Sequence, residues 1–83
     1  MNDGRFELPG GWVLVERDVD LFGRVCSYAI EGTAYEVVRT PVGWRARLAQ
    51  HGHARRAFKS APYESAPQVV RYLVKYAHLR GAR

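Results

Sequence analysis

Groups that form covalent cross-links or bind metal ions are scarce in this sequence. Cys26 is the only cysteine among 83 residues, so neither an intrachain disulfide nor a cysteine-based zinc site can form. A lone thiol of this kind is typical of a small apolar core residue. The segment MNDGRFELPG lacks the apolar run of a signal peptide, and no stretch approaches the length of a membrane span. We therefore expect a cytoplasmic protein with no membrane association.

The motifs of the common enzyme classes are also missing. No G-x-S-x-G, H-E-x-x-H, Walker-type or G-x-G-x-x-G pattern occurs. Gly10 and Gly11 precede an expected strand and not a helix, so they cannot form a phosphate-cradling loop. His51 and His53 flank an expected hairpin tip with no carboxylate near them in sequence, which favours a solvated turn over a metal site. We predict no catalytic activity, no bound metal and no cofactor.

Acidic residues are almost absent from the second half of the chain. The net charge is +5, but residues 1–38 carry three arginines against seven carboxylates, a balance of −4. Residues 39–83 carry ten arginines and lysines against Glu64 alone, a balance of +9. Such asymmetry indicates an acidic or polyanionic partner for the second half. The alternative is that the two halves pack together and neutralise each other.

The length suits one domain, and no low-complexity segment or linker divides it. Residues 1–10 are expected to form a loose lead-in. Further along, β-branched and aromatic residues alternate with polar ones between glycine-containing turns, which predicts an antiparallel sheet over residues 11–59. About five short strands are expected, at residues 12–17, 25–30, 35–40, 44–49 and 54–59.

Helical periodicity follows these strands. Ser65 and Gln68 match a capping box, and an apolar stripe that includes Tyr76 then recurs at helical spacing. Arg80 is expected in the last turn, before Gly81 ends the helix. We predict a helix over residues 65–80 packed on the sheet, which gives an α+β fold with the order β-β-β-β-β-α. The exposed stripe of this helix is expected to carry Arg71, Lys75 and His78.

The clearest alternation in the sequence is WRARLA, at residues 44–49. It directs Arg45 and Arg47 away from the core. If Phe58 of the next strand points inward, that strand adds further outward cations. Arginine suits phosphate and carboxylate ligands, which favours a binding surface over a solvated charged face. The expected basic sheet face has no acidic residue and consists of Arg45, Arg47, Arg55 and Lys59, with Arg56 leaning inward beside Phe58.

Part of this pattern resembles a known family. The run GWRARL, a glycine turn and then RRAFKS before a helix look like the AP2-like DNA-binding domains at the N-termini of tyrosine integrases. The resemblance covers residues 35–79 and implies a three-stranded sheet backed by a C-terminal helix, with outward sheet residues in the DNA major groove. It implies that Arg45, Arg47, Arg55 and Lys59 contact duplex DNA. The chain departs from the family by two acidic-flanked strands in front and by Pro62 and Pro67 before the helix.

Two functions are open from the sequence. The first is a small non-enzymatic accessory protein that binds nucleic acid through its basic sheet face, with stacking on Tyr63 and Tyr72 if these are exposed. The second is a protein-binding inhibitor or adaptor from a phage or mobile element, similar in size and charge to anti-CRISPR proteins, that blocks a host complex. A structural subunit that pairs with a second copy at a strand edge is a third interpretation. The residues expected to bind nucleic acid or an acidic partner are Arg45, Arg47, Arg55, Arg56, Lys59, Arg71 and Lys75.

Overall fold

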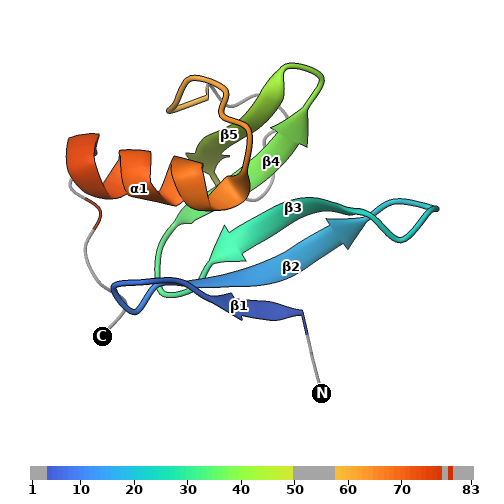
Figure 1. Cartoon of the computed structure of the whole chain (residues 1–83), viewed down its shortest axis with the longest axis horizontal. Helices are drawn as coiled ribbons and strands as arrows, with labels where there is room; N and C mark the ends of the chain where they lie inside the picture. The colour runs from blue at the N-terminus through green and yellow to red at the C-terminus, as the bar shows by residue number, and fades with distance from the viewer. Residues whose placement is uncertain (1–3, 50–57, 78, 80–83) are drawn as a thin grey trace.

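Five antiparallel strands and one C-terminal helix form two layers (Figure 1). The computed structural model describes residues 4–49, 58–77 and 79. Neighbouring strands in the sheet follow chain order, β1-β2-β3-β4-β5. This arrangement confirms the predicted α+β fold. The strands are β1 Arg5–Glu7, β2 Val13–Val19, β3 Val25–Ile30, β4 Tyr35–Thr40 and β5 Gly43–Leu48, and the helix is α1 Ala66–Tyr76.

Strand β1 lies within the segment predicted as a loose lead-in. It pairs antiparallel with the start of β2, and Phe6 lies opposite Leu14. The connection between the two strands is closed by hydrogen bonds from Leu8 N–H to Trp12 O (2.7 Å) and from Gly11 N–H to Leu8 O (3.2 Å). The lead-in prediction is therefore wrong for residues 5–7, because the chain reverses at residues 8–12 and returns along β1 as β2.

One of the five described strands is β1, which was not predicted, whereas most of the strand predicted at residues 54–59 lies outside the described residues. Residues 54–57 lie outside the described residues, and Phe58 and Lys59 belong to no strand. The last strand that the structure describes, β5, ends at Leu48 and not near residue 59. The described sheet therefore has the predicted number of strands, but β1 is one that the sequence did not predict.

Residues 59–63 cover the outer edge of β5 instead. Lys59 N–H donates to Ala46 O (2.7 Å), and Trp44 and Tyr63 exchange backbone hydrogen bonds of 2.7 and 2.9 Å. This close approach requires Gly43, whose φ is +135° and where a Cβ atom would lie 2.7 Å from Tyr63 O. The edge of β5 is therefore hydrogen-bonded within the chain at Trp44 and Ala46, which blocks the addition of another strand there.

The core lies between α1 and one face of the sheet. Leu14 pairs with Ile30 and Val37 pairs with Ala46 on neighbouring strands, and all four point towards the helix layer. Full burial of a valine, leucine or isoleucine side chain contributes about 1.5–3 kcal/mol. Cys26, expected in the core, is only half-buried and is not part of this cluster. The buried hydrophobic residues are Trp12, Leu14, Ile30, Val37, Ala46, Ala66, Val69, Val70 and Leu73.

Helix α1 begins where the sequence predicts. Ser65 is its N-cap residue, and Ser65 N–H donates to Gln68 Oε1 at 2.9 Å, the glutamine half of a capping box. Residues Val69, Val70 and Leu73 form its buried stripe. No helix in residues 4–49, 58–77 and 79 is long and apolar enough to cross a membrane.

The predicted end of the helix at Arg80 is wrong, because α1 ends at Tyr76. Ala77 N–H and Leu79 N–H both donate to Leu73 O, at 2.9 and 3.2 Å. When an N–H group six residues further along the chain donates a hydrogen bond to a helix carbonyl, the backbone turns away from the helix axis. The helix therefore stops one turn earlier than its apolar periodicity indicates, and Arg80 and Gly81 lie outside the described residues.

Candidate nucleic-acid interface

Arg45 and Arg47 lie on the sheet face that points away from α1, as the alternation in β5 predicts. Ala46 between them is fully buried in the core. In the register of β4 and β5, Arg45 lies opposite Val38 and Arg47 lies opposite Glu36. The prediction that the basic sheet face has no acidic residue is therefore wrong.

Glu36 neutralises Arg47 inside the protein. Arg47 Nε donates to Glu36 Oε2 at 2.6 Å. The side chain of Arg47 is 30% exposed and that of Glu36 only 10% exposed. Hydrogen bonds between ionised groups are roughly twice as strong as neutral ones, and partial burial reduces their screening by salt. The charge of Arg47 is therefore balanced by Glu36 within the protein, and its side chain presents little net positive charge to a ligand.

Arg45 is held by the segment that covers the edge of β5. Its Nε donates to Ser60 O at 3.2 Å, and its guanidinium carbon lies 4.2 Å from the centre of the Phe58 ring. The Ser60 hydroxyl also accepts the Ala46 N–H at 3.0 Å. No carboxylate forms an ion pair with Arg45 in the part of the chain that the structure describes. Arg45 thus keeps its charge but has lost much of its freedom to reorient.

The remaining predicted cations of the sheet face are only partly described. Lys59 is exposed, whereas Arg55 and Arg56 lie outside the described residues. Of the three described cations that the sequence assigns to this face, Arg47 is ion-paired, Arg45 is stacked on Phe58, and Lys59 is exposed but belongs to no strand. The face therefore offers less available charge than its sequence indicates.

The helix presents its cations differently. Arg71 and Lys75, four residues apart on α1, are both exposed, and α1 contains no acidic residue. Residues at this spacing lie one above the other on one face of a helix. The structure therefore brings Arg71 and Lys75 together, as predicted for the exposed stripe, while His78 lies outside the described residues.

Three tyrosines stand in a row beside these cations. Ring centres of Tyr63 and Tyr72 lie 5.8 Å apart and those of Tyr72 and Tyr76 lie 5.1 Å apart. The Lys75 ammonium lies 5.2 Å from the centre of the Tyr76 ring. Tyr76 was predicted on the packed apolar stripe, yet it is 60% exposed, because the buried stripe is complete with Val69, Val70 and Leu73. We call Tyr63, Tyr72 and Tyr76 the tyrosine row.

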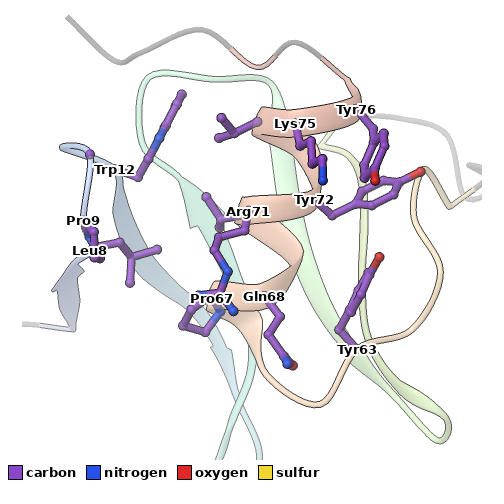
Figure 2. A pocket seen from close by; sticks show the side chains of 13 residues that line it. Leu8, Pro9, Trp12, Tyr63, Pro67, Gln68, Arg71, Tyr72, Lys75 and Tyr76 are labelled. Atoms are coloured by element: carbon purple, nitrogen blue, oxygen red, sulfur yellow. The ribbon is translucent and has the colours of Figure 1, made fainter.

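A shallow groove of about 770 Å³ follows α1 and includes the tyrosine row (Figure 2). One flank is apolar and runs between the β1–β2 connection and the helix. The other flank carries the tyrosines and Lys75, and Arg71 extends from the helix between the two (Figure 2). No carboxylate is found among the lining residues that the structure describes. The apolar flank consists of Leu8, Pro9, Trp12, Val70 and Val74.

Metal-ligating side chains are not gathered in this region. Among residues 4–49, 58–77 and 79, no three His, Cys, Asp or Glu side chains are placed to hold a metal ion. His51 and His53 lie outside that part of the chain. The groove therefore offers aromatic faces, aliphatic surface and positive charge as its means of binding.

Comparison with known proteins identifies no relative of this chain. No protein-family model, no curated protein and no solved structure matches it.

Proposed function

We propose that this protein binds nucleic acid through helix α1, with single-stranded nucleic acid preferred. The observation that carries the proposal is the tyrosine row, with ring centres 5.8 and 5.1 Å apart, beside the exposed Arg71 and Lys75 on a helix with no acidic residue. Aromatic side chains next to a positively charged groove are the recurring means by which proteins hold single strands. The charge excess of the second half of the chain is consistent with this role.

The two components of the surface have separate tasks. Arg71 and Lys75 would neutralise backbone phosphates, which provides affinity without sequence preference and makes binding sensitive to salt. Tyr76, 60% exposed at the end of the row, would accept a base on its open face. Unstacked bases are available in single strands and not inside a duplex, so the row favours single-stranded DNA or RNA.

The sheet face supports the proposal less well. Binding of duplex DNA by Arg45 and Arg47 would require Arg47 to leave Glu36 and Arg45 to leave Phe58 and Ser60. Each departure removes a contact that stabilises the fold. The helix surface needs less rearrangement, because Arg71 and Lys75 are both exposed and only the 5.2 Å contact of Lys75 with the Tyr76 ring would change.

The proposal is tested by titrating labelled single-stranded DNA, single-stranded RNA and duplex DNA with the protein at several salt concentrations, following fluorescence anisotropy. We expect the double variant R71Q/K75Q to bind more weakly and with a smaller dependence on salt. The negative slope of log affinity against log salt should become shallower by about 1.4, or about 0.7 for each lost phosphate contact on a single strand. The R17Q variant is the control for a lost positive charge, because Arg17 is exposed on β2, outside the groove.

Two outcomes would reject the helix surface. If R45Q/R47Q loses binding while R71Q/K75Q retains it, the basic sheet face is the site. If no form of nucleic acid binds near physiological salt, the positive charge serves a protein partner, and the inhibitor or adaptor function takes precedence.

A further inference from the structure

Three aromatic side chains lie next to one another on the part of the sheet that α1 leaves uncovered. Phe6 lies opposite the core residue Leu14, and Tyr28 lies opposite the core residue Val37, so both are on the face that carries the helix. The ring centre of Tyr28 is 5.6 Å from that of Phe6 and 5.6 Å from that of Trp44. Figure 1 shows β2 and β3 extending beyond the start of α1, which leaves this part of the face open. We call Phe6, Tyr28 and Trp44 the sheet aromatics.

A pocket of about 330 Å³ lies between the sheet aromatics and the start of α1. Leu8 and Pro67 add aliphatic surface to its wall. The rings are accessible, because Phe6 is 40% exposed and Tyr28 and Trp44 are half-buried. The pocket is separate from the tyrosine row and has the volume of a small-molecule site, about 300–1,000 Å³.

The charge of this pocket is opposite to that of the helix groove. Its described lining includes the carboxylate residues Glu7 and Glu64 and no arginine, lysine or histidine. Both glutamates are exposed, and neither forms an ion pair within the part of the chain that the structure describes. The start of α1 contributes a partial positive charge, which Glu64 offsets because it directly precedes the N-cap residue Ser65. The lining is therefore anionic.

Ionised groups near the sheet aromatics leave this balance negative. Glu16 lies opposite Tyr28 on the neighbouring strand, and burial together with the charge of Glu16 raises the pKa of the Tyr28 phenol. The Arg39 guanidinium carbon is 6.0 Å from the centre of the Trp44 ring, outside the pocket lining. Arg39 shares the carboxylate of Asp20 with a second arginine, so this cluster adds one positive charge. Three glutamates outweigh it.

These features favour a cation without N–H groups. The faces of aromatic rings attract positive charge, and several rings around one site are the usual means of binding quaternary ammonium groups. An ammonium or guanidinium ion would lose hydrogen bonds to water against the aliphatic and aromatic wall, whereas a quaternary ammonium ion has none to lose. An anion would meet the uncompensated charges of Glu7 and Glu64.

We propose that the pocket beside the sheet aromatics binds the quaternary ammonium group of a small molecule. The rings of Phe6, Tyr28 and Trp44 would contact the methyl groups of the cation. Glu7 and Glu64 would supply the balancing negative charge at longer range. The acidic residues of the first half of the chain thereby serve a ligand of opposite charge to the one proposed for α1.

Titration of the full chain with choline, followed by NMR of the backbone amides and the tryptophan indoles, tests this proposal. We expect saturable shifts at Phe6, Tyr28 and the indole N–H of Trp44, with a dissociation constant of about 1 mM or lower. The indole of Trp12 is the internal reference, because Trp12 lines the helix groove and not this pocket. The neutral isostere of choline, in which carbon replaces nitrogen, is expected to bind at least about tenfold more weakly.

Two variants separate the contribution of the rings from that of the charges. Phe6→Leu keeps an apolar side chain but removes one ring face, and we expect choline affinity to fall about 2- to 30-fold, the range of one cation–π contact. E7Q/E64Q is expected to weaken choline binding at least about threefold and to leave binding of the neutral isostere unchanged. Y76L, which removes an aromatic ring from the helix groove instead, is the control and should bind choline normally. Circular dichroism confirms that each variant is folded.

Four outcomes would overturn the proposal. These are the absence of saturable shifts, shifts confined to the helix groove, equal affinity for choline and its neutral isostere, and unchanged choline affinity in both F6L and E7Q/E64Q. Binding of a peptide that contains trimethyl-lysine, without binding of free choline, would overturn it in favour of a protein partner.

The proposal goes beyond nucleic-acid binding and does not depend on it. Phe6 does not line the helix groove, so F6L is expected to bind single-stranded nucleic acid within about twofold of the wild type. R71Q/K75Q is expected to retain its affinity for choline. Either proposal can therefore fail without the other.

Discussion

Arg47 on β5 donates a 2.6 Å hydrogen bond to the carboxylate of Glu36, directly opposite on β4. The two residues are eleven positions apart in the chain, and their pairing decides how the sheet face can function. The arginine that the sequence presents as a ligand for phosphate already has an anionic partner. The basic sheet face therefore offers less available positive charge than the sequence indicates, whereas Arg71 and Lys75 are exposed on a helix with no acidic residue.

Replacing Glu36 by glutamine is expected to lower the free energy of unfolding by about 1–3 kcal/mol, because a partly buried guanidinium loses its charged acceptor. Urea denaturation followed by tryptophan fluorescence measures this loss. E31Q, which removes the carboxylate of the more exposed Arg5–Glu31 pair, is the control and is expected to lose less stability. Equal losses in E36Q and E31Q would show that the burial of the Arg47–Glu36 pair has no energetic consequence.

The same E36Q variant separates the two candidate surfaces for nucleic acid. It frees the charge of Arg47 without touching α1. If the helix binds nucleic acid, the affinity of E36Q for a single strand should stay within about twofold of the wild type, because one distant charge is largely screened at physiological salt. A clear gain in affinity for duplex DNA, measured by anisotropy, would instead indicate binding at the sheet face.

Tyr76→Leu tests the stacking component of the proposed function. Leucine keeps an apolar side chain at this exposed position but removes the aromatic face. We expect single-strand affinity to fall by about 5- to 150-fold, the equivalent of about 1–3 kcal/mol for one stacked base, with the salt slope unchanged. Y35L, which alters a half-buried tyrosine on β4 away from the groove, is the control, provided that it folds. An unchanged affinity in Y76L would exclude Tyr76 from the site.

Gly43→Ala is expected to be among the most damaging single changes to the fold. The added Cβ atom would lie 2.7 Å from Tyr63 O, at a φ of +135°, so the segment that covers β5 has to move. Overpacking of this kind typically costs about 1–3 kcal/mol in addition to the backbone strain. G11A is the matched control, since Gly11 has a φ of +86° but no atom near its added Cβ. A thermal unfolding midpoint equally lowered in both variants would contradict a steric role for Gly43.

Acid is expected to loosen the β2–β3 turn. Hydrogen bonds from the backbone N–H groups of Arg24 and Phe22, with the charge of Arg24, hold the pKa of Asp20 below its ordinary value of 3.8. A lowered pKa in the folded state means that the stabilisation is complete above pH 3.8 and is lost as the pH falls through the lower, folded value. Glu31 behaves in the same direction, because the hydrogen bond from the side chain of Arg5 lowers its pKa.

Amide hydrogen exchange at Phe22 and Arg24, measured between pH 5 and pH 2 and corrected for intrinsic rates, detects this loosening. D20N keeps an oxygen acceptor for the two N–H groups but cannot titrate, so its protection should vary less with pH. If the wild type and D20N show the same dependence on pH, Asp20 does not control the turn.

Local patterns were sufficient for most elements of the fold. Strands β2 to β5 follow from β-branched and aromatic runs between glycine turns, and the start of α1 follows from Ser65 and Gln68, because these signals act within a few residues of the chain. Strand β1 has no such signal. Three residues are too few to show a period, and Arg5–Glu7 becomes a strand only because the chain reverses at residues 8–12 and places it beside β2.

The candidate site was only partly predictable. Arg71 and Lys75 were correctly placed together on the helix surface, since helical spacing alone determines which residues share a face. Counting back from the Pro41–Val42 turn would have placed Glu36 opposite Arg47, because a tight hairpin determines the register of its strands. The contact of Arg45 with Phe58 and the exposure of Tyr76 had no comparable signal, because both depend on how a later segment packs.

The sequence by itself determined the class of the fold, the direction in which Arg45 and Arg47 point and the concentration of positive charge in the second half. These properties depend on composition and on periods of two and 3.6 residues, which neighbouring residues carry. Only the tertiary structure decided which charges are free to act. Arg47 pairs with Glu36, and Arg45 stacks on Phe58. Tyr63 lies in line with Tyr72 and Tyr76. Each of these arrangements joins residues from different segments of the chain. Such contacts form only when the packing of the core brings those residues together.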